Sequence, residues 1–164
     1  MKAWILCMMA GLISCHLTAQ PLNTLEKLLN KELAVTLKSP GISDYLNGEE
    51  LNVIVPFSIK NDTLRVTLKR TDAVTGNYRI EEQQVALQQI GSLGKDGTLI
   101  FNTKEPVQRR ITSYYDGQIS NSTAMAPHCW LYIGIGAKSE KLQQKIIELL
   151  AKAGYMITKD SLID

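Results

Sequence analysis

Six basic and aromatic side chains on predicted strands are the residues of this sequence whose chemistry suits ligand binding. Guanidinium groups hold carboxylates and phosphates through paired hydrogen bonds, and aromatic rings stack on sugars or cations. Such a set would hold an anionic or glycan ligand. The alternative interpretation is that these groups keep an exposed sheet soluble. The candidates are Arg65, Lys69, Arg110, Tyr114, Trp130 and Tyr132.

Two further pairs have the residue types of catalysis, but their spacing argues against it. His128 and Cys129 are adjacent, and neighbours along a strand point to opposite faces, so the imidazole does not reach the thiol. Glu81 and Glu82 lie in a polar run that is interpreted as a solvated strand surface. A zinc site lacks ligands around the single later histidine. The sequence therefore predicts no catalytic residue, no metal site and no cofactor.

The first 20 residues have the pattern of a secretory signal peptide. Lys2 gives a positive start, Ala3 to Ile13 is an apolar run, and small or polar residues follow. Cleavage near Ala19-Gln20 would release a mature chain that begins around Pro21. The apolar run is shorter than the roughly 20 residues that span a bilayer, so no transmembrane helix is expected.

A lipid anchor is the alternative outcome for the N-terminus. Residues 12–15, Leu-Ile-Ser-Cys, resemble a bacterial lipobox, in which Cys15 would be acylated. Soluble release is favoured, because helix signals begin soon afterwards and leave little flexible tether. The mature domain then holds Cys129 alone, and a lone thiol in an oxidising compartment survives best when buried, so Cys129 is predicted to be a core residue.

Residues 51–70 have the pattern of a β-hairpin with one apolar face. A four-residue turn over residues 60–63 turns the nitrogen of Pro56, which carries no hydrogen, away from the partner strand. Pro56 therefore predicts that the first strand is a sheet edge, or is bulged there. The predicted side-chain pairs are Ile59 with Leu64, Phe57 with Val66, and Val55 with Leu68.

Four more strands and two helices complete the predicted elements. Glycines 91, 94 and 97 are interpreted as a loop, and residues 118–127, rich in Ser, Thr and Asn without an apolar period, as a mobile loop. Trp130 and Tyr132 share one face of the last strand. The elements are a helix over 23–34, strands over 78–87, 98–103, 106–115 and 128–135, and an amphipathic helix over 139–153.

This order predicts an α+β fold: a bent antiparallel sheet or partly open barrel of about six strands, with an N-terminal helix and a C-terminal amphipathic helix packed on it. Residues 21–154 form this single domain and residues 155–164 a C-terminal tail. In element order over Leu51 to Ala153, the chain resembles the pleckstrin-homology-like fold. That family usually has a Trp in its last helix, whereas Trp130 precedes the helix here. The resemblance implies binding rather than catalysis and transfers no residue.

The charge balance narrows the expected partners. The formal net charge is +2, so no bulk field favours nucleic acid. We expect a small exported, non-enzymatic binding or interaction module of the bacterial cell envelope, periplasmic or secreted, with a protein partner or an anionic or glycan ligand. The alternatives are an envelope hydrolase without a recognisable motif, acting beside residues 118–127, and an accessory subunit that docks through an open sheet edge.

Overall fold

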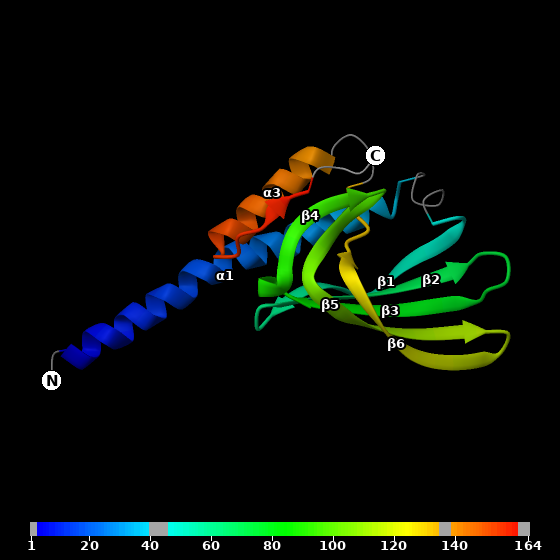
Figure 1. Cartoon of the computed structure of the whole chain (residues 1–164), viewed down its shortest axis with the longest axis horizontal. Coiled ribbons are helices and arrows are strands. Elements are labelled where there is room, and N and C mark those ends of the chain that lie inside the picture. Colours follow the sequence, from blue (N-terminus) through cyan, green and yellow to red (C-terminus); the bar gives the residue numbers. More distant parts are fainter. Residues whose placement is uncertain (1–2, 40–45, 135–138, 161–164) are drawn as a thin grey trace.

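The structure, a computed structural model, describes residues 3–39, 46–134 and 139–160, with side chains from Gln20 onward. These residues form an α+β domain in which two helices pack on one curled sheet (Figure 1), as the sequence predicts. The elements are α1 (Ala3–Thr36), β1 (Glu49–Lys60), β2 (Thr63–Asp72), β3 (Tyr78–Ala86), the 3-10 helix η1 (Leu87–Gln89), β4 (Ile90–Asp96), β5 (Thr98–Tyr115), β6 (Gln118–Trp130), α3 (Ser139–Lys152) and β7 (Thr158–Lys159).

The strands of the described residues form a seven-stranded half-barrel in the order β1-β2-β3-β5-β4-β7, with β6 on the other side of β5. All neighbours are antiparallel except β4 and β7, which are parallel. The first half of β5 pairs with β4 and its second half with β3. Because one strand serves both halves, the bend in β5 curls the sheet, as Figure 1 shows.

Pro56 lies in an irregular part of the edge strand β1. The register between β1 and β2 shifts between Val53 and Val55 and again between Val55 and Ser58. Two polar side chains of α1 bond the displaced backbone: Asn30 bonds both the N–H and the C=O of Phe57 at 2.8 Å, and Glu26 accepts from the N–H of Ile59 at 2.8 Å. The prediction of a bulged edge at Pro56 is confirmed, and α1 covers part of that edge.

The predicted turn and part of the predicted register are wrong. Lys60 pairs with Thr63, so the turn holds two residues, Asn61 and Asp62, both with positive φ (49° and 55°), as a type I′ turn requires. Val55 pairs with Thr67 rather than Leu68 and is 46% exposed. The bulge accommodates the proline instead of a longer turn. Ile59 still faces Leu64.

The core lies between the concave side of the sheet and the two helices. It combines one stripe of α1 with Phe57, Phe101 and Ile146, and each of these last three side chains is at most 1% exposed. Cys129 is buried at 1%, which confirms the sequence prediction, and burial raises the pKa of its thiol to about 12. The stripe of α1 consists of Leu25, Leu29 and Leu33. Asn23, predicted to begin a helix, lies inside α1.

Two segments predicted as loops are strands. Residues 118–127 belong to β6, which pairs with β5 from Gln118 to Ala126 and again at His128 to Trp130. Glycines 91 and 94 lie in β4, and only Gly97 turns the chain, with φ of 67°. The predicted strand over 128–135 ends at Trp130, and Ile135 lies outside the described residues.

The chain beyond α3 returns to the sheet. Ile157 is 9% exposed, and β7 pairs with β4 at Ser92 and Leu93. Asp160 accepts a hydrogen bond from Ser92 at 2.6 Å and contacts the amide of Asn102. Of the helices in the described chain, none combines the length and apolar character needed to cross a membrane.

Candidate functional site

A cleft of about 400 Å³ opens on the concave side of the sheet, beside the end of β6. Strands β2, β3 and β5 supply its basic side chains, and the chain after Cys129 supplies its aromatic wall. Three arginines face two aromatic residues here, which is the combination that suits an anion with an apolar part. The lining residues are Leu46, Arg70, Arg79, Glu81, Asp96, Arg109, Trp130 and Tyr132.

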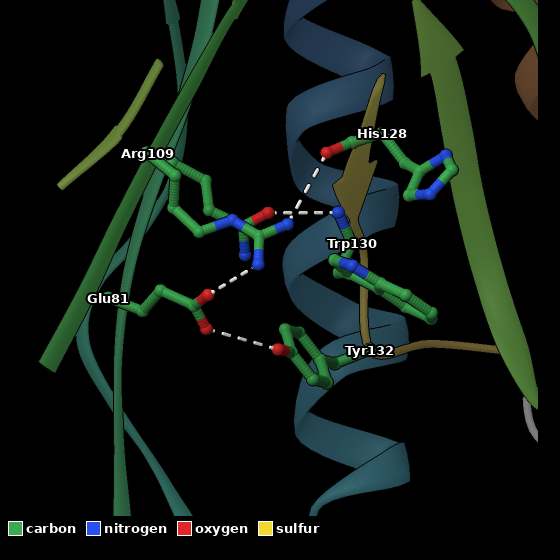
Figure 2. A network of polar contacts seen from close by, with 6 residues as sticks. Glu81, Arg109, His128, Trp130 and Tyr132 are labelled. Carbon is green, nitrogen blue, oxygen red and sulfur yellow. Dashed lines mark hydrogen bonds and ion pairs between the residues drawn. The ribbon is translucent and has the colours of Figure 1, made fainter. Parts of the chain in front are cut away.

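Glu81 is the centre of a buried polar network in this cleft (Figure 2). Its side chain is 2% exposed, and Arg109 approaches one carboxylate oxygen at 2.8 Å. The hydroxyl of Tyr132 donates to the other oxygen at 3.3 Å. The prediction that residues 81 and 82 are a solvated surface is therefore wrong for Glu81, because alternate residues of β3 face the core.

Side chains around this network also hydrogen-bond the main chain of β6. They do so along the edge of β6 that faces away from β5, where no described strand lies beside it. Arg109 donates to the C=O of His128 at 3.5 Å (Figure 2), and the side chain of Gln83 accepts from the N–H of Trp130 at 2.9 Å. Side chains thus replace the strand that would close the barrel. Part of this network is therefore architectural.

Tyr132 is held in an unusual state by this network. Its φ is 53°, in the left-handed region that favours glycine. Burial, and then the negative charge of Glu81, raise the pKa of Tyr132 well above its ordinary value. The phenol therefore stays protonated and remains a donor to Glu81, whose two oxygens are both engaged. A carboxylate so engaged is poorly placed to remove a proton from a substrate.

Arg70 and Arg79 are direct cross-strand partners on the concave face. Two positive charges at opposite positions repel each other unless anions lie between them. Arg70 contacts Glu49, but Arg79 forms no ion pair with any residue that the structure describes. Its Nε is buried and contacts no acceptor in that part of the chain. Arg79 is thus the arginine of the cleft left without a counter-charge.

The structure separates the six predicted binding residues into two groups. Trp130 and Tyr132 line the cleft. The other four residues lie on the convex face, because successive residues along each strand point to opposite faces of the sheet. On that face Lys69 Nζ lies 4.0 Å from the centre of the Tyr78 ring, and Tyr78 stacks on Tyr114 at 5.0 Å. The other two predicted residues on the convex face are exposed: Arg110, which lies 3.7 Å from Glu82, and Arg65.

Sequence reasoning missed Arg79, Glu81 and Arg109 as parts of the site. The available signal was alternation along β3, which puts Arg79 and Glu81 on the face of buried Val85. Arg109 had no comparable signal, because its meeting with Glu81 depends on how β5 bends beside β3.

A second cavity of about 630 Å³ lies beside β4, β5 and β6. Lys95 and His128 line it together with two carboxylates, and Asp160 already accepts hydrogen bonds from Ser92 and Asn102. Charges of both signs thus face this space. Nowhere in the described ranges do three His, Cys, Asp or Glu side chains gather to hold a metal ion.

Comparisons of the chain with family models, with curated proteins and with solved structures find no match. The function is therefore inferred from the geometry of the cleft.

Proposed function

We propose that this chain is a small exported, non-enzymatic binding module whose ligand carries an anionic group held by Arg79. The observation that carries the proposal is the arginine pair in the cleft. Arg79 lies opposite Arg70, its Nε is buried, and no carboxylate of the described residues pairs with it. An anion at this point removes the repulsion within the pair and supplies acceptors for the guanidinium.

The surroundings of Arg79 favour binding over catalysis. Both oxygens of Glu81 are engaged by Arg109 and Tyr132, and burial keeps the pKa of Tyr132 high. These two groups therefore orient the cleft and do not exchange protons with a ligand. Trp130, which is half-buried, adds an aromatic surface at the other side of the cleft. A carboxylate or phosphate with an apolar body fits this arrangement.

The experiment is anion binding measured with inorganic phosphate as the probe. Phosphate titrated at constant ionic strength against chloride is expected to raise Tm and to shift amide resonances of β2 and β3 around the cleft. Arg79→Gln removes the fixed charge while keeping a shorter, polar side chain. We expect it to weaken phosphate binding by about tenfold or more, the scale of one lost charge-assisted contact.

Arg65→Gln is the matched control. Arg65 lies on the same hairpin as Arg70 but faces the convex side, where it is exposed. This variant changes the net charge by the same amount and is expected to leave phosphate binding unchanged. Equal responses of wild type, Arg79→Gln and Arg65→Gln would mean that phosphate acts through general screening, and the cleft would then not be the site.

Export is the second part of the proposal, and intact mass tests it. The full chain expressed with its own N-terminus in a bacterial host is expected to lose mass corresponding to cleavage near Ala19-Gln20. A mass showing acyl chains on Cys15 would instead identify a lipoprotein, and an uncleaved mass would contradict export. In support, cleavage leaves Pro21 at the start of the remaining helix, a position that proline favours.

A further inference from the structure

The edge of β6 that faces away from β5 has no strand neighbour among the described residues. In Figure 1 the β5–β6 hairpin lies beside β3, and β6 borders the sheet there. Its turn, Asp116-Gly117, has positive φ at both positions, so Tyr115 and Gln118 form the first hydrogen-bonded pair. Because the pairing then runs without a shift to Ala126, the N–H and C=O groups of odd residues 119–125 point outward.

This edge lacks the features that usually prevent strands from pairing. Residues 118–127 carry no charged side chain, and no proline occurs before Pro127. Two large apolar side chains stand exposed on it, Ile119 at 66% and Met125 at 64%. An isolated apolar residue needs no explanation, but two on the same face of an open, uncharged edge favour addition of another strand.

The spacing of these residues matches a second copy of the same edge. When two β6 strands pair antiparallel about a two-fold axis at Ser122, Ile119 of each copy faces Met125 of the other, and Asn121 faces Thr123. These positions are odd, so their outward N–H and C=O groups meet in hydrogen-bonded pairs, whereas Ser122 falls in a non-hydrogen-bonded pair. Both exposed apolar residues are covered in this register.

We propose that two copies of this chain associate through β6 in this register and form one continuous sheet. A second copy is favoured over a charged peptide because the edge offers no charge to recognise one, and two copies bring no like charges together. The proposal is independent of anion binding, since none of the residues 119–125 lines the concave cleft. Phosphate binding and dimer formation succeed or fail separately.

The test is analytical ultracentrifugation of the full chain purified after export, over a range of concentrations. Wild type is expected to show a concentration-dependent dimer. Thr123→Pro removes an outward N–H without removing a hydrogen bond to β5, so the monomer is expected to fold with an unchanged circular dichroism spectrum while dimerisation is lost. A wild type that is monomeric at about 1 mM overturns the proposal, as does a Thr123→Pro variant that dimerises normally.

Charge exchange tests the register and remains informative if the proline variant fails to fold. Ile119→Lys and Met125→Glu, made singly, each place unpaired charge in the interface and are expected to weaken the dimer by about tenfold or more. The double variant brings the introduced lysine of one copy to the introduced glutamate of the other, twice, and is expected to recover the dimer. Within one copy these positions are six residues apart on one strand and do not meet. Failure of the double variant to recover overturns the register.

Discussion

The two long edges of the sheet, β1 and β6, are completed in different ways. The β1 edge is interrupted by Pro56 and by two register shifts, and α1 bonds its backbone through Glu26 and Asn30. The β6 edge has two parts. At residues 128–130 the side chains of Gln83 and Arg109 bond it, whereas along residues 119–125 no described strand lies beside it.

This difference shows that polar side chains substitute for strands wherever an edge lies against the core. Glu26, Asn30, Gln83 and Arg109 each bond main-chain groups that a neighbouring strand would otherwise bond. Along 119–125 the edge of a single copy is solvated instead, so water bonds the same groups. The comparison predicts large losses of stability at the covered positions and small ones at the open positions.

The largest effect is expected at the covered part of β6. Arg109→Leu leaves Glu81 buried without its cation and is expected to lower the free energy of unfolding by about 3–5 kcal/mol. Urea unfolding followed by circular dichroism measures it. The double variant Glu81→Leu with Arg109→Leu is expected to be more stable than Arg109→Leu alone. A double variant less stable than the single one would show that Glu81 contributes independently of Arg109.

At the β1 edge, Asn30→Ala removes both hydrogen bonds to Phe57 and leaves its backbone groups unbonded. The expected loss in the free energy of unfolding is about 2–3 kcal/mol. Asn121→Ala is the matched control, since it changes the same residue type on the open edge and removes only an exposed hydrogen bond from the hydroxyl of Thr112 at 2.8 Å, so a loss below about 1 kcal/mol is expected there. Equal losses in the two variants would remove the distinction between the edges.

Glu26→Gln should have a smaller effect than Asn30→Ala. The glutamine keeps an oxygen that accepts from the N–H of Ile59, and only the negative charge is lost. The expected loss is about 1 kcal/mol or less, measured by the same unfolding experiment. Glu26→Ala, which removes the acceptor, serves as the comparison and should cost more. A larger loss in Glu26→Gln than in Glu26→Ala would contradict the proposed acceptor role.

The smallest effect is expected at the turn after β2. The N–H groups of Thr75 and Val74 hold the pKa of Asp72 below its ordinary value of 3.8. The charged form therefore stabilises the fold above that value, and the stabilisation is lost as the pH falls through the lower folded pKa. Asp72→Asn is expected to lower Tm slightly at pH 7, and the difference should shrink as the pH falls below the ordinary pKa of 3.8. A difference that stays constant with pH would contradict this origin.

Elements that bury one face were predictable from the sequence, and elements that bury neither were not. β2 and α3 have clear apolar periods because one side of each contacts the core. Residues 118–126 of β6 are exposed or half-buried, so no period marks them, and the sequence suggested a loop. Their strand character comes from pairing with β5, which is a long-range contact.

The candidate site was predictable only in part, for a related reason. Trp130 and Tyr132 were recognised because aromatic residues near a strand end are conspicuous. Glu81 was misinterpreted because its run, Glu-Glu-Gln-Gln, has no apolar residue to mark the buried face until Val85. The pleckstrin-homology-like resemblance stays a prediction, since it rests on element order alone.

The pairing of β4 with β7 has a consequence for when the protein can fold. Ser92 bonds Asp160, which is 68 residues further along the chain, and α1 shares its core with α3 near the other end. A chain synthesised from its N-terminus pairs β4 with β5 early, but it completes the packing of α1 and the second edge of β4 only after residues 139–160 are made. Folding through such distant contacts is slow. The architecture thus leaves part of the core and one strand pairing unformed until the segment that contains α3 and β7 has been made.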